Sequence, residues 1–481
     1  MKIAFVASEI TPFAKTGGLA DVAAALPRAL HELGHELRVF MPLYAGVRDA
    51  RFVLQPVPSI QDVPLLLGTH PYEFSLYSAT LPGSTLTIHL IDCPALFARS
   101  MLYTSDTDEH LRFILMQRAV LESLQRMQFA PDILHCNDWH TGLLPLMIRT
   151  SYGWDRLFQN TRSLLSIHNI GYQGVFAAAN ASDTGIVDIG AYIHPEDLAL
   201  GQINWLKEGI RHADMVSTVS PTYAHEICTP AGGQGLDAVL RGRGDHVLGI
   251  LNGVDYEIWN PAIDKTLPAP YTVDDLQGKQ RCKQTLLQLA GLPADPAMPV
   301  VGLISRLAMQ KGIDLLVDSL PALLDTRDFV LCVLGSGDPQ YVAFFTELMQ
   351  RFPERVFFRN GYDESLAHLI EAGSDMFLMP SLYEPCGLNQ MYSLKYGTIP
   401  IVRKTGGLAD SVQMWDGNDG NGIVFNDYDA PAVNWALNTA LDLFADKPSW
   451  ARMMRNAMTR DFSWRHQARE YLRMYEQMMT E

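Results

Sequence analysis

The heptapeptide Lys-Thr-Gly-Gly-Leu-Ala-Asp occurs twice in this chain, at residues 15–21 and again at residues 404–410. Each copy follows a short apolar run and leads into a stretch with helical spacing. Because identity over seven residues is improbable by chance, we expect two strand-loop-helix units of similar build. A Gly-rich loop that opens a helix offers unpaired backbone N–H groups and the positive end of the helix dipole. Two such loops, each beside a lysine, predict a cleft between two α/β halves that holds an anionic ligand.

Short apolar runs alternate with helical patterns from one end of the chain to the other. This alternation is typical of parallel sheets with helices on both faces. The runs form two series, so the sequence predicts the α/β class with two doubly wound, Rossmann-like domains. The first series is 2–7, 37–41, 85–92, 132–136, 163–168 and 215–219, and the second is 300–305, 329–334, 356–359, 376–379, 398–402 and 422–425.

Composition excludes several classes of partner. The 481 residues include 37 basic and 53 acidic side chains, and no run of Lys and Arg stands out, so we expect no nucleic acid partner. No apolar stretch reaches 18 residues and the N-terminus has no secretory pattern, so we expect no membrane partner. The six cysteines are scattered without a CxxC pair, which fits a reducing cytoplasm. With a net charge of −16, only a local cationic cluster could hold an anion.

Three acidic segments could suggest a metal, and we interpret each as local structure. Residues 416–421 lack the ligand spacing and closing Glu of a calcium loop, so we expect a surface turn. The Asp-x-Asp triplets at 106–108 and 427–429 precede helical patterns, where Asp caps are common. The sequence therefore predicts no metal and no cofactor.

Two loops supply candidate phosphate ligands. In the first heptapeptide, Gly17 and Gly18 allow close backbone approach and Lys15 brings a mobile charge. In the second series, Arg306 and Lys311 follow the apolar run at 300–304, which places them at the carboxyl end of a strand. Arg clamps phosphate oxygens with its planar fork and Lys adds a point charge, so the pair could stabilise a departing diphosphate.

Three further segments place polar side chains after strands. Glu384 is the carboxylate best placed to touch a sugar hydroxyl or a developing cation, and a nucleophile role is conceivable. Gly387 and Leu388 begin a helix whose N-terminus could face phosphate. Asp138 follows one first-series strand, and His168 ends another. The alternatives are a carboxylate that favours a helix dipole and a structural histidine.

These segments occur in one order along nearly the whole chain, and together they resemble the starch and glycogen synthase family. The match includes Asp138-Trp139-His140, His168-Asn169, the link at 251–255, the Glu384-Pro385-Cys386-Gly387-Leu388 loop and Gly406-Gly407-Leu408, besides the Lys15 and Arg306–Lys311 loops. The resemblance implies the two-domain GT-B fold with a deep cleft, in which 1–248 with the C-terminal helix at 462–481 forms the acceptor-side domain. Residues 249–461 would form the nucleotide-sugar domain.

The resemblance also implies transfer of glucose from ADP-glucose to the non-reducing end of an α-1,4-glucan, with retention of configuration. Lys15, Arg306 and Lys311 would bind the diphosphate, and His168 would contact the glucosyl unit. Glu384 would lie beside the donor sugar, and Asp138 would support the acceptor side. The remaining residues implied for donor binding are Gly17, Gly18, Asn252, Cys386, Gly387 and Leu388.

Some features leave alternatives open. Leu382-Tyr383 stands where many relatives have Arg-Phe, Cys136-Asn137 precedes Asp138 where His is common, and Tyr392 stands where related transferases carry a second Glu. We prefer same-face attack assisted by the leaving phosphate over a covalent glucosyl-Glu384 intermediate. The other functions considered are a UDP-glucose synthase, a nicotinamide oxidoreductase, which the missing GxGxxG disfavours, and a silent glucan-binding protein. The oligomeric state is not predicted.

Overall fold

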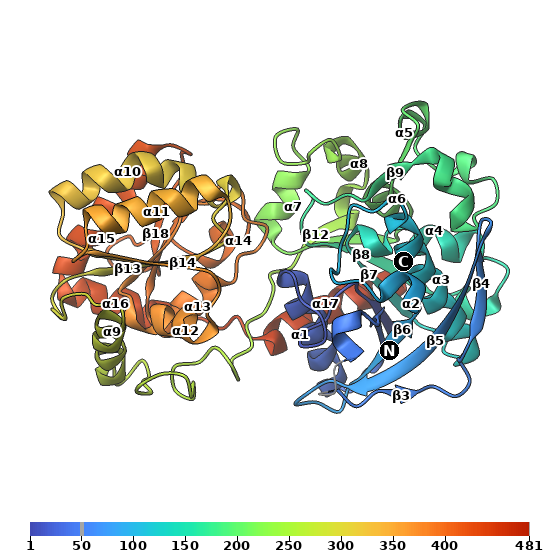
Figure 1. Ribbon diagram of the computed structural model, residues 1–481, viewed down its shortest axis with the longest axis horizontal. Helices are drawn as coiled ribbons and strands as arrows, with labels where there is room; N and C mark the ends of the chain where they lie inside the picture. Colours follow the sequence, from blue (N-terminus) through green and yellow to red (C-terminus); the bar gives the residue numbers. More distant parts are fainter. Residues whose placement is uncertain (49–51, 481) are drawn as a thin grey trace. The chain divides into compact units, whose positions relative to one another are not determined.

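A computed structural model describes residues 1–48 and 52–480, which form two compact units (Figure 1). Unit 1 comprises Met1–Val219, Ala224–Gly253 and Trp464–Glu481, and unit 2 comprises Ser220–Tyr223 and Val254–Ser463. Within the described ranges, no helix is both long enough and apolar enough to cross a membrane.

Unit 1 is built on a ten-stranded sheet with the order β12-β11-β8-β7-β1-β2-β6-β5-β3, and β4 pairs with β5. The strands are β1 (Lys2–Val6), β2 (Glu36–Pro42), β3 (Gln55–Pro56), β4 (Val63–Leu67), β5 (His70–Thr80), β6 (Thr87–Asp92), β7 (Ile133–Asn137), β8 (Arg162–Ile167), β11 (Met215–Thr218) and β12 (Val247–Gly249). A separate antiparallel pair joins β9 (Val175–Ala177) to β10 (Gln202–Asn204).

The sheet of unit 1 is mixed, whereas the alternation of elements predicted a parallel one. Strands β12 to β6 run parallel, but β5 pairs antiparallel with β6, β3 and β4. The short turn at 81–86 cannot carry the crossover that a parallel pair requires, so β5 and β6 form a hairpin. This antiparallel edge was missed because β5 alternates buried and exposed side chains, unlike the fully buried central strands.

The helices of unit 1 pack on the faces of this sheet. They are α1 (Gly18–Glu32), α2 (Pro94–Phe97), α3 (Glu109–Arg126), α4 (Leu144–Arg149), α5 (Pro195–Ala199), α6 (Trp205–His212), α8 (Asp237–Gly242) and α17 (Trp464–Thr480). Helix α7 (Pro221–Ile227) is divided, because its residues up to Tyr223 group with unit 2 and the rest with unit 1. Short 3-10 turns lie at η1 (Ala45–Arg48), η2 (Trp139–Thr141), η3 (Arg156–Phe158), η4 (Ala178–Thr184), η5 (Ile189–Ala191) and η6 (Gly244–His246).

The C-terminal helix α17 belongs to unit 1, although it follows the whole of unit 2 in sequence. Its apolar side is buried, including Tyr471 and Tyr475, and the Tyr475 hydroxyl lies 2.7 Å from His135 Nδ1 on β7. The two chain segments that join the units lie side by side, because the Val254 N–H donates to the Phe462 carbonyl over 2.7 Å.

Unit 2 contains a six-stranded parallel sheet with the order β15-β14-β13-β16-β17-β18. Chain order therefore reverses between the first strand, β13, and the fourth, β16. Open α/β sheets bind ligands outside the carboxyl ends of the strands at such a switch point. The strands are β13 (Val300–Ile304), β14 (Val330–Gly335), β15 (Val356–Asn360), β16 (Met376–Met379), β17 (Ile399–Arg403) and β18 (Ile423–Phe425).

Helices cover both faces of the unit 2 sheet, as predicted. Helices α10, α11 and α15 lie on one side and α9, α12, α13 and α16 on the other (Figure 1). Their bounds are α9 (Gln277–Leu289), α10 (Ile313–Thr326), α11 (Pro339–Arg351), α12 (Glu364–Gly373), α13 (Asn389–Tyr396), α14 (Gly406–Ser411), α15 (Ala430–Ala445) and α16 (Lys447–Met458), with a 3-10 turn η7 (Met309–Lys311). The strands are buried from both sides, which explains their nearly unbroken apolar sequence.

Candidate active site

Unit 2 brings two predicted loops together at its switch point. The loop after β13 carries Arg306 and Lys311, and the loop after the neighbouring strand β16 carries Glu384. Lys311 Nζ lies 2.5 Å from Glu384 Oε2, and the Ser381 hydroxyl donates to the same oxygen over 3.1 Å. The Leu382 N–H donates to the Gln310 carbonyl over 2.9 Å, which ties the two loops through their backbones. The predicted cation and carboxylate therefore form one pair, in which Glu384 is buried and Lys311 is partly exposed.

Arg306 lies in the same loop but faces a different partner. Its guanidinium donates to Gln310 Oε1 over 2.9 Å. A neutral amide competes only weakly with phosphate for an Arg fork, so this contact leaves Arg306 suited to an incoming anion. The carboxyl edge of unit 2 thus holds two cations, one paired with a carboxylate and one with an amide.

The loop residues that follow Glu384 lead directly into α13. Leu388 is the N-cap residue of this helix, and Gly387 precedes it with φ 70°, a backbone conformation that favours glycine. Any Cβ at Gly387 would also overlap the Gln390 amide. Cys386 is buried. It contributes its carbonyl, which accepts from Gln390 Nε2 over 3.0 Å.

The two copies of the heptapeptide have different surroundings. A Cβ added at Gly18 meets no atom within 4 Å, and one added at Gly17 meets only Glu9 Oε1, at 3.8 Å. In the second copy, a Cβ at Gly406 would overlap the Glu384 carbonyl, and one at Gly407 would overlap the Cys386 backbone. The first loop is therefore open, whereas the second, predicted to be a similar anion cradle, is filled by the chain's own Glu384 loop.

The Lys15 loop of unit 1 is held by hydrogen bonds to the buried carboxylate of Glu9. Lys15 Nζ pairs with Asp21 at 2.7 Å, with half of the lysine side chain exposed. Glu9 accepts the Thr16 N–H over 2.6 Å and the Thr16 hydroxyl over 2.8 Å. Burial raises the pKa of Glu9, and the hydrogen bonds from Thr16 partly oppose that rise. Glu9 follows β1 and was not predicted, because a lone carboxylate after a strand carries no pattern.

Asp138 and His168 follow the adjacent strands β7 and β8, and the structure brings them together. Asp138 Oδ1 accepts the His168 N–H over 2.8 Å. Burial raises the pKa of Asp138 to about 7, although backbone N–H groups of His168 and Asn169 oppose the rise. Burial also lowers the pKa of His168 to about 4, so its imidazole is neutral at pH 7.

The tautomer of His168 follows from its neighbour Asn137. The Asn137 Nδ2 donates to the Val6 carbonyl over 3.0 Å, which turns its Oδ1 toward His168. His168 Nε2 lies 2.9 Å from that oxygen and must carry the proton. Asn137 therefore orients the imidazole.

Asp138 occupies a strained backbone conformation, with φ 56° and ψ −175°. This region is nearly restricted to glycine and costs on the order of 1–3 kcal/mol for other residues. Such strain persists where the surroundings over-determine the conformation, often at functional sites. Here the side chain is fixed by the backbone of the His168 loop.

Other predicted residues lie elsewhere. Asn252 follows β12, which β11, β8 and β7 separate from β1, so unit 1 does not bring it beside Lys15. It is buried, and its Oδ1 has no hydrogen-bond partner among the described residues. Asp429 caps α15 as predicted, whereas Asp108 pairs with Arg99 and makes no capping bond. No group of three metal-ligating side chains occurs in residues 1–48 and 52–480.

Two further aromatic residues of unit 2 lie in segments that follow the Glu384 loop and β15. Tyr392 stacks on Trp259 with ring centroids 4.0 Å apart and an interplanar angle of 2°. Tyr392, which the resemblance placed where related transferases would carry a second Glu, is therefore part of an aromatic stack. Tyr362 follows β15 at the carboxyl edge and is 79% exposed. An exposed aromatic ring just after a strand end is the signal that could have identified it.

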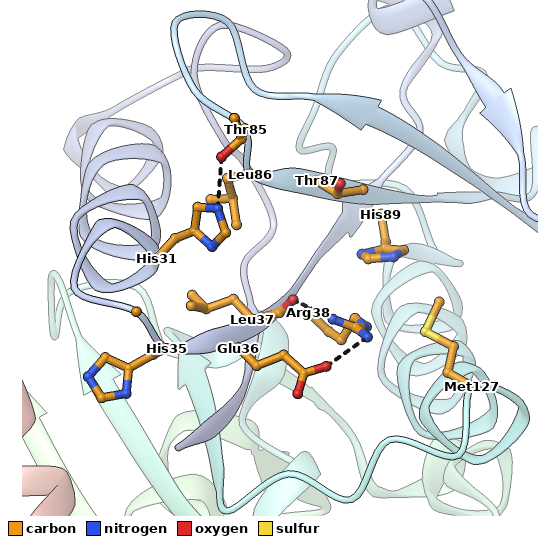
Figure 2. Close-up of a pocket in the computed structure, with 11 residues that line it drawn as sticks. His31, His35, Glu36, Leu37, Arg38, Thr85, Leu86, Thr87, His89 and Met127 are labelled. Atoms are coloured by element: carbon orange, nitrogen blue, oxygen red, sulfur yellow. Dashed lines mark hydrogen bonds and ion pairs between the residues drawn. The ribbon is translucent and has the colours of Figure 1, made fainter.

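A separate hollow of about 700 Å³ lies at the amino-terminal ends of parallel strands in the unit 1 sheet. Figure 2 shows that its polar lining includes His31, His89 and the Arg38–Glu36 pair. It lies where β2 and β6 begin, whereas Lys15, Asp138 and His168 follow the carboxyl ends of their strands. The hollow is therefore distinct from the candidate active site.

Two doubly wound α/β units, with cations and a carboxylate at a switch point, define a GT-B glycosyltransferase. A family model described as the starch synthase catalytic domain matches residues 2–242, and one described as glycosyl transferases group 1 matches 290–459. A glycogen synthase from Aeromonas hydrophila is 43% identical, covering 100% of this chain and 99% of that protein. The chain belongs to the starch and glycogen synthase family.

Solved structures agree with this assignment. The catalytic domain of starch synthase IV from Arabidopsis thaliana, bound to ADP and acarbose, is similar with a TM-score of 0.91 and 34% identity, covering 100% of this chain and 99% of that one. A sucrose-phosphate synthase from Thermosynechococcus elongatus shares the fold with a TM-score of 0.60 at 18% identity, covering 100% and 99% of the two chains. The predicted family and fold class are confirmed.

Proposed function

We propose that this protein transfers glucose from ADP-glucose to the non-reducing end of an α-1,4-glucan, with retention of configuration and release of ADP. The observation that carries the proposal is the Lys311–Glu384 pair at the unit 2 switch point, beside Arg306. Two cations at this edge suit a diphosphate, and a carboxylate held among them suits a sugar hydroxyl. ADP bound to the related starch synthase IV supports the choice of nucleotide.

Each group has a role in the proposed reaction. Arg306 and Lys311 hold the diphosphate and stabilise the charge that develops as ADP departs. Lys15 supplies a further cation in the open loop of unit 1, where half of its side chain is exposed. Neutral His168 faces the glucosyl unit, and Asp138 holds the His168 loop. The exposed ring of Tyr362 provides a stacking surface for the nucleobase.

The geometry favours same-face attack over a covalent intermediate. Glu384 Oε2 accepts from both Lys311 and Ser381, which reduces the nucleophilicity of that carboxylate. In same-face attack, the departing phosphate accepts the proton from the acceptor hydroxyl while the new glycosidic bond forms. Trapping a glucosyl adduct on Glu384 would overturn this mechanism.

The function is tested by incubating the protein with glycogen and ¹⁴C-labelled ADP-glucose or UDP-glucose. We expect label in the polymer mainly from ADP-glucose, and release of that label as maltose by an exo-acting β-amylase. Such release shows an α-1,4 bond at the non-reducing end and therefore retention. Preferential incorporation from UDP-glucose would change the donor, and no incorporation from either would leave a glucan-binding protein.

We also propose a cytoplasmic location. All six cysteines are free thiols, five of them buried, as a reducing compartment maintains them.

A further inference from the structure

The loop that carries Glu384 is held mainly through its carbonyl groups. The Leu382 carbonyl accepts from Arg403 over 2.7 Å, and the Glu384 carbonyl accepts the Gly407 N–H over 3.1 Å. The Cys386 carbonyl accepts from Gln390 Nε2 over 3.0 Å. Arg403 ends β17 and Gly407 lies in α14, so much of the support comes from the second heptapeptide and the strand before it.

Close approach between the two segments requires glycine at two adjacent positions. Gly406 has φ 42°, and a Cβ there would overlap the Glu384 carbonyl. A Cβ at Gly407 would overlap the Cys386 carbonyl and lie 2.5 Å from the Cys386 Cα. These neighbours are backbone atoms and cannot rotate away, so any larger residue would displace the loop.

Buried hydrogen bonds through Gln390 and Ser411 also connect the Glu384 loop to α14. Gln390, fully buried on α13, donates from Nε2 to Cys386 and also to Ser411 Oγ over 3.1 Å. The Ser411 hydroxyl in turn donates to the Gly407 carbonyl over 2.6 Å. Helix α13, helix α14 and the Glu384 loop are thus joined by one continuous hydrogen-bonded path.

We propose that the second heptapeptide forms the surface on which the Glu384 loop packs. Gly406, Gly407 and Gln390 are then positioning residues that place Glu384 against Lys311. The proposal deepens the proposed function and rests on it for the role of Glu384. The first copy keeps its glycines open toward a ligand, whereas the second has its glycines covered by the loop. The same seven residues therefore serve ligand binding in unit 1 and loop positioning in unit 2.

The test uses Gly407→Ala in the full-length protein, with two readouts. Alkylation of Cys386 by iodoacetamide, followed by peptide mass spectrometry, reports loop displacement without any substrate. Cys386 is 5% exposed in the wild type, so we expect its alkylation to accelerate about tenfold or more once the Glu384 loop is displaced from the second heptapeptide. The core thiol Cys332, which is 0% exposed, should stay protected if the unit remains folded.

The second readout is steady-state kinetics with ADP-glucose and glycogen. We expect kcat to fall by about 10- to 100-fold, because small misplacements of catalytic groups have effects of this size, while the KM for glycogen stays unchanged. The matched control is Gly242→Ala, since a Cβ at Gly242 meets no atom within 4 Å. It should alter neither readout.

Gln390→Met provides a second variant if Gly407→Ala does not fold. It keeps the side-chain length but removes the amide, and we expect faster Cys386 alkylation and lower kcat, each about threefold to tenfold. A folded Gly407→Ala or Gln390→Met protein with wild-type alkylation and kcat would overturn the proposal. Alkylation of Cys386 needs no sugar donor. A wild-type protein that is inactive with ADP-glucose would therefore contradict the proposed function, and alkylation would still test whether the second heptapeptide positions the Glu384 loop.

Discussion

Glu384 receives both of its recorded donors, Lys311 and Ser381, on a single oxygen. These two contacts hold the buried carboxylate in one orientation. Donor phosphate and Glu384 would then compete for Lys311, so binding must redistribute the lysine's hydrogen bonds. Residue-scale predictions concern this pair and the Asp138–His168 contact.

Lys311→Ala removes the cation that faces the leaving diphosphate. We expect kcat to fall by ~10²-fold or more, since a charge at the departing group acts mainly in the transition state. Steady-state kinetics with ADP-glucose measure the effect, and circular dichroism checks the fold. Lys265→Ala removes an exposed lysine of unit 2 and serves as the control. Wild-type kinetics in folded Lys311→Ala protein would exclude Lys311 from the mechanism.

Asp138→Asn tests a pH dependence. Burial raises the pKa of Asp138 to about 7, so the wild-type carboxylate protonates as pH falls through 7 and its hold on the His168 loop weakens. We expect kcat/KM of the wild type to fall as the pH is lowered through 7. We expect kcat/KM of Asp138→Asn not to show this fall.

The stability effect of Asp138 has the opposite direction. A folded pKa above the ordinary value of 3.8 means that the folded state prefers the proton. The stabilisation is complete below about pH 4 and is lost as pH rises through 7. Thermal unfolding at pH 6 and pH 8 should therefore show a smaller loss of Tm in Asp138→Asn than in the wild type. Identical pH profiles for the two proteins would contradict this assignment.

At the scale of elements, both sites consist of a loop after one parallel strand braced by a loop or helix from another. In unit 1, Asp138 after β7 braces the loop after β8, whereas the Lys15 loop after β1 is braced by Glu9 of the same loop. In unit 2, the loop after β13 pairs with the loop after β16. The carboxyl edge of a parallel sheet makes this possible because neighbouring strands end together.

The two heptapeptides allow a matched comparison of Lys15→Ala with Lys404→Ala. Lys15 is half exposed and its pair with Asp21 contributes at most about 1 kcal/mol, so a diphosphate can displace Asp21. We expect Lys15→Ala to raise the KM for ADP-glucose by about tenfold and Lys404→Ala to leave it unchanged. Donor saturation curves at constant glycogen provide the measurement. Equal effects of the two substitutions would contradict distinct roles for the two copies.

At the scale of the whole molecule, the chain forms two units, and two of the segments at their boundaries, near Val254 and Ser463, pair with each other. Unit 2 has a large apolar core of its own on both faces of its sheet. Unit 1 is closed by α17 from the other end of the sequence. Unit 1 therefore needs the complete chain for its packing, whereas unit 2 is continuous apart from Ser220–Tyr223.

Scanning calorimetry with and without ADP tests this organisation. We expect two unfolding transitions, since each unit buries its own core, and a selective rise of the unit 2 transition with ADP. At 100 times Kd, a ligand that binds only the folded state stabilises it by about 2.7 kcal/mol. ADP that shifted only the unit 1 transition would contradict nucleotide binding at the β13–β16 switch point.

Much of the fold could be predicted from local pattern. All twelve predicted apolar runs overlap strands, and β16 matches its predicted range at both ends. Central parallel strands are buried on both faces, so burial leaves a continuous apolar signature. The edge strands β3, β4 and β5 were missed because half-exposed strands lack that signature.

The positions of Lys15, Arg306, Lys311 and Glu384 were determined by the sequence itself, because a strand followed by a loop places the next polar residues at the carboxyl edge. Only the tertiary structure decided three other features. These are the hydrogen bonds of Glu9 to the first heptapeptide, the strained backbone of Asp138, and the covering of the second heptapeptide by the Glu384 loop. Periodicity records which face of an element is buried. Contacts between segments distant in sequence depend on strand order, and identical peptides acquire different roles when different segments of the chain pack against them.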